Sequence, residues 1–158
     1  MAKPTYQELM DAGVHFGHMK RKWNPKMQPN IFMERKGIHI IDLNRTGAEL
    51  DRAAKALKQI ASSGKKVLFV ATKKQARDIV SKGALSVGMP FVVDRWLGGM
   101  MTNFATIRKS VKKMQTIDTM LADTTLTSVT KKERLTLTRE RNKLERVLGG
   151  IANLNRLP

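Results

Sequence analysis

Apolar residues in the first hundred positions form short unbroken runs, separated by stretches with helical periodicity. The runs IHIIDL (38–43), KVLFVAT (66–72) and FVVD (91–94) are typical of strands covered on both faces. Between them, apolar residues recur at helical spacing over 50–61 and 76–87. Strand, helix, strand, helix and strand in succession predict right-handed parallel crossovers. We therefore expect an α/β fold, a parallel sheet with flanking helices.

Three helix beginnings are marked by a threonine that is followed three residues later by a glutamate. Each such pair can form a capping box, in which either side chain binds the other residue's backbone N–H group. The pairs are Thr5 with Glu8, Thr46 with Glu49, and Thr130 with Glu133. They predict a short helix at about 6–12 and longer helices after Thr46 and Thr130. Residues 14–29 keep no period and contain proline and glycine, so we expect an ordered loop, followed by a turn at Gly37.

The last third of the chain changes to two long helical stripes. Thr102 is expected to cap the first helix, whose apolar residues run from Phe104 to Leu121, and a second stripe runs from Leu137 to Ile151. A polar stretch at 127–130 separates them. Spacing near 3.5 on two successive helices predicts an antiparallel two-helix coiled coil. Because its apolar stripe is narrow, we expect this hairpin to protrude from the body as an arm.

These patterns predict three parts of the chain. Residues 1–101 form an α/β body with an N-terminal helix, a basic loop and the parallel strands. Residues 102–150 form the coiled-coil hairpin, and residues 151–158 begin to return to the body.

The net charge narrows the choice of partner. Lys and Arg number 30 against 13 Asp and Glu, which gives a formal charge of +17. Such an excess repels itself in the free protein, and phosphate backbones both neutralise it and release counterions on binding. No apolar run reaches the roughly 18 residues of a membrane span, and no basic amphipathic segment lies near a terminus. We therefore expect a nucleic-acid partner and no membrane. The absence of cysteine from the sequence excludes disulfides and thiolate metal sites.

A nucleotide-binding enzyme on the same α/β frame is the alternative function. The turns after the first two strands, DLNRTGAE and ATKKQA, contain one glycine and none, so neither forms a phosphate-binding loop. Lys73 and Lys74 at a helix N-terminus could still hold one phosphate. Asp42 and Asp94 end strands, where active sites often lie, but each has a local alternative, as a helix cap or as a partner of Arg95. We predict no catalytic residue and no cofactor.

The histidines and tryptophans each have a structural and a functional interpretation. His15, His18 and His39 lack a nearby carboxylate or cysteine that would complete a metal shell, so a structural or RNA-facing role is favoured. Trp23 stands among cations in GHMKRKWNPKMQP, and Trp96 stands in DRWLGGMMTN. Either indole could stack on a base or pack against the body, and packing is favoured. We expect the rings to stiffen loops whose cations contact RNA.

Five segments, in this order, resemble the S-two family of bacterial small-subunit ribosomal proteins. They are LMDAGVHFGH, KWNPKMQPNIFMERKGIHIIDLNRT, KKVLFVATKKQA, DRWLGGMMTNFATI and KLERVLGGI, and the resemblance covers essentially the whole chain. It implies an α/β body with a protruding coiled coil, and a non-enzymatic structural role in the cytoplasmic ribosome. It further implies binding of small-subunit rRNA at the head–body junction and late entry into assembly.

The resemblance also implies protein neighbours and RNA-facing residues. The neighbours are other small-subunit proteins, including the large multi-OB-fold protein that captures mRNA, and a homo-oligomer is not expected. Family members usually continue past LNRLP with further strands and a helix, so we expect this chain to be part of a longer polypeptide. The RNA-facing candidates are Lys20, Arg21, Lys22, Trp23, Asn24, Lys26, Lys73, Lys74, Arg95, Thr102, Asn103, Arg108, Lys109, Lys112 and Lys113.

Overall fold

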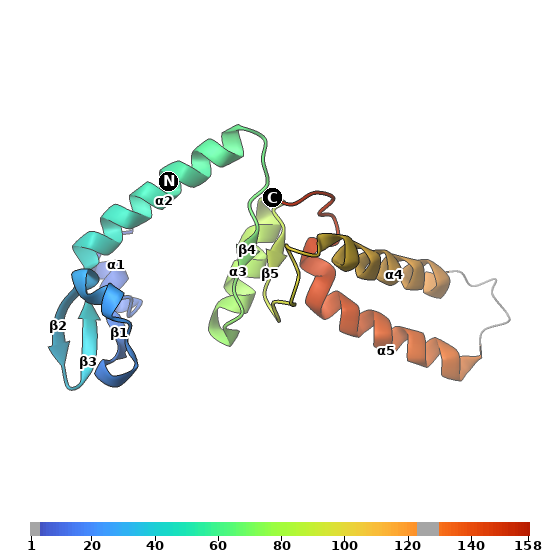
Figure 1. The fold of residues 1–158 in the computed structure, drawn as a ribbon, viewed down its shortest axis with the longest axis horizontal. Coiled ribbons are helices and arrows are strands. Elements are labelled where there is room, and N and C mark those ends of the chain that lie inside the picture. The colour runs from blue at the N-terminus through green and yellow to red at the C-terminus, as the bar shows by residue number, and fades with distance from the viewer. Residues whose placement is uncertain (1–3, 123–129) are drawn as a thin grey trace. The chain divides into compact units, whose positions relative to one another are not determined.

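A computed structural model describes residues 4–122 and 130–158 of the chain, which fall into two compact units (Figure 1). The first unit is Met1–Ser62 and the second is Ser63–Pro158. Within the described residues, no helix is both long and apolar enough to cross a membrane.

The first unit begins with a short helix and a three-stranded antiparallel sheet. Helix α1 (Tyr6–Asp11) has the predicted capping box, because the side chains of Thr5 and Glu8 each accept a hydrogen bond from the other residue's backbone N–H. The strands β1 (Phe16–Met19), β2 (Ile31–Arg35) and β3 (Ile38–Ile41) lie in the order β1-β3-β2. Strand β1 and two short 3-10 helices thus replace much of the loop predicted at 14–29.

A tight turn decides how β3 pairs. Lys36 and Gly37 both have positive φ, 52° and 74°, as a two-residue hairpin turn requires. Arg35 therefore faces Ile38, and β2 and β3 run antiparallel. The prediction that the 38–43 run lies in one parallel sheet with the later strands is wrong. A neighbouring strand joined by two residues pairs at a small loop-closure cost, whereas a parallel partner needs a long crossover.

Helix α2 (Leu43–Ser62) completes the first unit and starts earlier than predicted. The Asp42 carboxylate accepts a hydrogen bond from the Asn44 N–H at 2.9 Å, so Asp42 caps the start of α2, as predicted for it as the alternative to an active-site role. Thr46 lies inside the first turn and donates its hydroxyl to the Asp42 carbonyl, so the predicted capping box at Thr46 is wrong. The predicted apolar stripe is exposed in this unit, with Leu50 at 46% and Leu57 at 40% of full exposure.

The second unit contains one parallel β–α–β element. Strands β4 (Phe69–Val70) and β5 (Phe91–Val92) pair in parallel and are joined through α3 (Lys74–Ser86). The predicted parallel pairing of two strands joined through a helix is therefore present here, with strands much shorter than the apolar runs 66–72 and 91–94. Only two described strands form this ladder, so the parallel sheet is smaller than the sequence predicts.

Two long helices, α4 (Phe104–Ala122) and α5 (Lys131–Leu148), pack in opposite directions in the second unit (Figure 1). Near the middle of α4 Lys113 pairs with Glu140, and near the end of α4 the Leu121 carbonyl accepts from the Arg134 guanidinium, so the contacts run antiparallel. Thr130 and Glu133 form the predicted capping box of α5. Most of the predicted polar interruption, 127–129, lies outside the described residues.

The start of α4 differs from its predicted cap by one residue. The helix begins at Phe104, so Asn103 rather than Thr102 directly precedes it. The Asn103 side-chain oxygen accepts a hydrogen bond from the Thr106 hydroxyl at 2.9 Å. Asn103 therefore occupies the position next to the helix start that was predicted for Thr102.

The core of the second unit joins β5, the two long helices and the following turn. The short 3-10 helix η3 (Gly149–Ile151) approaches β5 so closely that a Cβ on Gly150 would lie 2.2 Å from the Phe91 carbonyl oxygen. Only glycine allows this contact without a backbone shift. The buried cluster built around it consists of Val92, Met100, Ile107, Val111, Leu148, Ile151 and Leu154.

Candidate nucleic-acid interface

The first candidate surface is the basic loop, residues 20–26, which the structure holds in two short 3-10 helices. The first, η1 (Lys20–Lys22), is tied to the β2–β3 turn because the Lys20 N–H donates to the Gly37 carbonyl at 3.0 Å. The second, η2 (Pro25–Asn30), is capped by Asn24, whose side-chain oxygen accepts from the Lys26 N–H at 2.9 Å. The cations are thus carried on ordered backbone.

The indole of Trp23 packs on the sheet. Its ring stacks on the imidazole of His39, with centroids 4.8 Å apart and planes 26° from parallel. His39 belongs to β3 and is buried. The packing role favoured for Trp23 is confirmed, while Trp96 remains 39% exposed, so packing accounts for less of that side chain than predicted.

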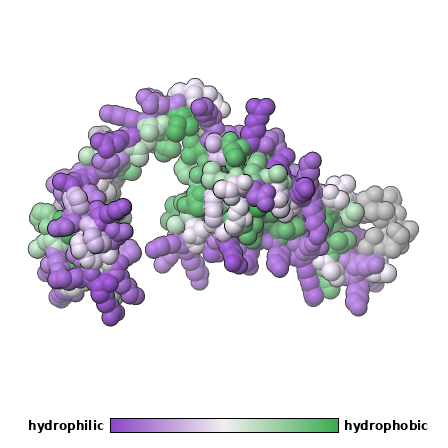
Figure 2. Space-filling model, viewed as in Figure 1, coloured by the Kyte–Doolittle hydropathy of each residue, from purple (hydrophilic) through white to green (hydrophobic). Residues whose placement is uncertain are grey.

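The cations of the basic loop differ in whether a carboxylate already pairs with them. Lys20 Nζ lies 2.9 Å from the Glu34 carboxylate, but both side chains are substantially exposed, so the pair is weak and breaks readily in favour of a phosphate. Arg21, Lys22 and Lys26 are exposed. Figure 2 shows that hydrophilic residues cover most of the visible face of the unit that contains the loop.

The second candidate surface lies at the start of α3. Lys73 occupies the position before the helix and makes no side-chain capping bond, and Lys74 is its first residue. Both side chains are exposed. The free N–H groups of a helix N-terminus together with two ammonium groups favour an anion there.

The third candidate surface is α4, where the structure separates two kinds of cation. Arg108 donates from Nη1 to the Leu154 carbonyl at 2.9 Å and is half-buried, so it ties the C-terminal segment to the helix. Lys113 is held by Glu140 on α5. Lys109 and Lys112 are exposed on the helix surface. The ion-paired and buried cations are thus worse candidates for RNA than their neighbours.

The other predicted residues of the second unit, Arg95, Thr102 and Asn103, are exposed in the segment between β5 and α4. The candidates therefore form one group in the first unit, residues 20–26, and several in the second, residues 73–113. Local chain geometry brings together the members of each group.

Asp94 is the anchor of an ion-pair cluster that the sequence did not predict. Its carboxylate accepts from Arg77 Nη1 at 2.9 Å and from Arg146 Nε at 2.6 Å, and its side chain is only 12% exposed. The predicted partner was Arg95, which is wrong. Arg77 and Arg146 come from α3 and α5, and 52 residues separate Arg146 from Asp94, so no local sequence pattern signals the contact.

This geometry removes the strand-end site of the enzyme alternative. Asp42 follows β3 in the antiparallel sheet and caps α2, whereas Asp94 follows β5 in the parallel pair and binds two arginines. The two carboxylates therefore do not end neighbouring strands of one sheet. Within residues 4–122 and 130–158, no three His, Cys, Asp or Glu side chains cluster closely enough to hold a metal ion. His15 packs against the ring of Phe16, with centroids 4.1 Å apart.

Helix caps perturb two carboxyl groups. Hydrogen bonds from the backbone and hydroxyl of Thr5 lower the pKa of Glu8, and the equivalent bonds from Thr130 lower the pKa of Glu133. Each bond favours the charged carboxylate over the protonated acid. The hydrogen bond that Arg141 Nε donates to the Asp118 carboxylate is the largest cause of the raised pKa of Arg141, and it links α5 to α4. These shifts belong to helix ends and helix pairing.

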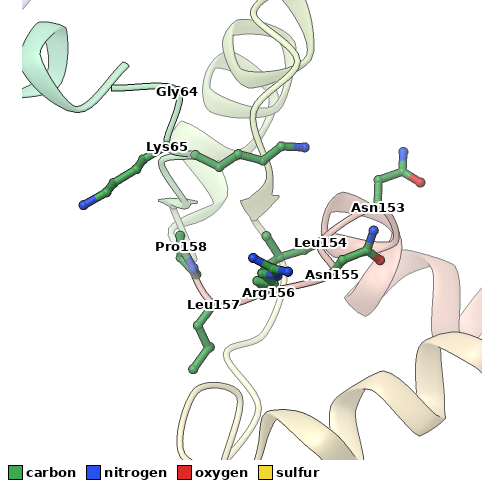
Figure 3. A pocket seen from close by; sticks show the side chains of 9 residues that line it. Gly64, Lys65, Asn153, Leu154, Asn155, Arg156, Leu157 and Pro158 are labelled. Atoms are coloured by element: carbon green, nitrogen blue, oxygen red, sulfur yellow. The ribbon is translucent and has the colours of Figure 1, made fainter. Parts of the chain in front are cut away.

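A wide pocket in the second unit lies where the C-terminal residues pass Gly64 and Lys65 (Figure 3). Its volume is about 550 Å³, and its polar side chains include Lys65, Lys66 and Arg156. The lining combines two lysines and an arginine with amides and apolar groups. It therefore has the charge expected of an anion-binding surface but no acid–base pair for catalysis.

Comparison with known proteins gives one consistent result. The sequence model of a family described as ribosomal protein S2 matches residues 9–158. The small ribosomal subunit protein uS2 of Bacteroides fragilis is 61% identical over 158 residues, which is 100% of this chain and 57% of that protein. The protein of the same description from Cytophaga hutchinsonii is 62% identical over 156 residues, 99% of this chain and 61% of that protein. The chain thus spans little more than half the length of these relatives.

Proposed function

Because this chain belongs to the ribosomal protein S2 family, we propose that it is a structural, non-catalytic constituent of the small ribosomal subunit and binds small-subunit rRNA. The match over residues 9–158 carries the proposal. The charge of +17 supports it, since such an excess repels itself in the free protein and favours a polyanionic partner. In this role the protein acts within the cytoplasmic ribosome and contributes to translation.

The rRNA contacts are proposed for the basic loop, the start of α3 and the exposed side of α4. Lys22, Lys26, Lys73, Lys109 and Lys112 are the strongest candidates, because they are exposed and near ordered backbone. Lys20 and Lys113 contribute after exchanging a carboxylate for a phosphate. Arg108 contributes by holding α4 against the C-terminal segment.

The finer features follow from the family resemblance. We propose that 1–101 serves as the body and 102–150 as a projecting coiled-coil arm, and that the protein joins the subunit late, at the head–body junction. Its protein neighbours include the multi-OB-fold protein that captures mRNA. The antiparallel packing of α4 and α5 against each other supports the arm, and it leaves Lys109 and Lys112 exposed on α4.

Salt-dependent binding tests this function directly. The chain should bind small-subunit rRNA far better than a neutral polymer at low salt, with affinity falling steeply as salt rises. Binding no better than to the neutral polymer would refute the proposal. Changing Lys112 and Lys113 together to glutamine should weaken binding to all RNA sequences alike and reduce the slope of log K against log salt by about one for each freely available lysine.

A matched pair controls for charge alone. Lys131 and Lys132 are also adjacent, exposed lysines, at the start of α5 and outside the predicted contacts. Changing them to glutamine removes the same two charges and should leave the salt slope nearly unchanged. Because Glu140 already holds Lys113, the Lys112→Gln change alone should account for most of the loss.

A further inference from the structure

A cavity of about 230 Å³ opens beside the basic loop, within the first unit. Trp23 and His39 contribute aromatic walls, and Met27, Ile31 and Ile41 contribute apolar ones. Its volume lies below the roughly 300 Å³ at which pockets for drug-sized ligands begin. It therefore suits a small flat group and no larger ligand.

The buried polar group of this cavity is the imidazole of His39, while His18, Lys22 and Asn24 also line it. His39 is 9% exposed, and neither ring nitrogen has a hydrogen-bond partner among the described residues. A neutral imidazole has one donor and one acceptor, and burying such groups without partners is unfavourable. A ligand that brings a hydrogen-bonding edge into the cavity would remove this penalty.

The aromatic walls define the shape of that ligand. The rings of Trp23 and His39 stack on each other with centroids 4.8 Å apart, so each ring holds the other in place and the walls are preformed rather than mobile. Flat rings that also carry donors and acceptors on their edges are the property of nucleobases, which single-stranded RNA offers to aromatic side chains.

The rim supplies the charge that a nucleotide needs. Lys22 and Asn24 line the cavity, and the segment 20–26 holds four cations and no acid. A phosphate on either side of a bound base would meet these cations. An apolar side chain from a protein neighbour would fill the cavity but leave the His39 nitrogens unpaired and give Lys22, on the rim, no counter-charge.

We propose that this cavity binds one unpaired RNA base, packed against the Trp23–His39 pair and hydrogen-bonded to His39. The inference deepens the proposed function and rests on it, because the base belongs to the rRNA that the basic loop contacts. Trp23 then has two roles, since its indole packs against His39 and also forms a wall of the site. The sequence alone favoured only the first.

Tryptophan fluorescence of the full chain tests the proposal. In a Trp96→Phe background Trp23 is the only tryptophan and reports on the cavity alone. The probes are a short single-stranded RNA oligomer and an abasic oligomer of equal length, which keeps the phosphates but has no bases. We expect the RNA oligomer to quench Trp23 saturably and to bind about tenfold more tightly than the abasic one, as for a single stacked base.

The outcomes separate the two proposals. If rRNA binds but both oligomers bind equally and Trp23 emission does not change, the base site is wrong and the proposed function stands; a cavity meant for a protein side chain would give this result. If neither oligomer nor rRNA binds at low salt, the proposed function and the base site fail together.

A second variant tests the hydrogen bond to the histidine. His39→Phe keeps the stacked ring and removes both nitrogens, so the tenfold preference should fall to about twofold while the chain remains folded by circular dichroism. His15→Phe is the matched control, because the Nδ1 atom of His15 is also buried without a partner among the described residues but does not line the cavity. An unchanged preference in His39→Phe would remove His39 from the site.

Discussion

Replacing Asp94 with alanine should destabilise the second unit more than any other single change of a charged residue in it. The carboxylate is 12% exposed and receives two charge-assisted hydrogen bonds, from Arg77 at 2.9 Å and from Arg146 at 2.6 Å. The change would leave Arg77, whose side chain is only 38% exposed and whose Nε is already buried without a partner among the described residues, facing an empty position. Helices α3 and α5 would both lose their ion pair with the carboxylate that follows β5.

The two bonds do not contribute equally. A hydrogen bond to a charged group in a partly buried site contributes about 1.5–3 kcal/mol, and this applies to Arg77. Arg146 is 78% exposed, so its bond is screened and contributes at most about 1 kcal/mol. Asp94→Ala should therefore lower the free energy of unfolding of the second unit by about 2–4 kcal/mol. Asp94→Asn keeps an acceptor oxygen and should cost about half as much.

Urea unfolding followed by tryptophan emission measures this change. Trp96 lies two residues from Asp94, so a Trp23→Phe background makes the emission a report on the second unit. Asp78→Asn is the matched control, because Asp78 is exposed on α3 and the net charge changes identically. Values for Asp94→Asn and Asp78→Asn that agree within about 0.5 kcal/mol would refute the ion-pair cluster as a stabilising feature. Arg146→Ala should add little once Asp94 is replaced.

Two further changes test close packing and capping. Gly150→Ala would place a Cβ 2.2 Å from the Phe91 carbonyl oxygen, so it should destabilise the second unit by about 3 kcal/mol or more in the same urea assay. Gly83→Ala is the control, because Gly83 lies in α3 with open space around the position of a Cβ, and this change should be neutral or stabilising. Thr130→Ala should reduce the helical signal at 222 nm at neutral pH. The folded state lowers the pKa of Glu133, so the stabilisation by its carboxylate is complete above the unfolded pKa of about 4.3 and is lost as the pH falls through the lower folded pKa. The difference in helical signal between Thr130→Ala and the parent should therefore shrink in acid.

Features set by neighbouring residues were the ones that the sequence predicted well. The capping boxes at Thr5 and Thr130 and the turn at Gly37 are all confirmed, and the parallel pairing of two strands joined through α3 is present. Each depends on side chains within a few residues of one another or on a regular apolar period. The box at Thr46 failed because Asp42 offers an equivalent cap one turn earlier, and a local pattern cannot choose between two competing caps.

Features set by pairing partners were the ones that the sequence missed. The apolar run at 38–41 is compatible with either strand direction, and only the two-residue turn and the neighbouring β1 made it the centre of an antiparallel sheet. Likewise, the sequence predicted RNA contacts for all three of the cations Arg108, Lys112 and Lys113. Two of them proved to be engaged by groups 46 and 27 residues away.

By itself the sequence determined the charge of +17, the helix periods, the capping boxes at Thr5 and Thr130, and the family to which the chain belongs. The tertiary structure decided which cations are free, which carboxylate joins α3 to α5, and that Trp23 and His39 share one cavity wall. The physical reason is range. Periodicity and capping act within one or two helical turns, whereas burial and ion pairing depend on which distant segments come into contact. Those long-range contacts cannot be derived from a single sequence.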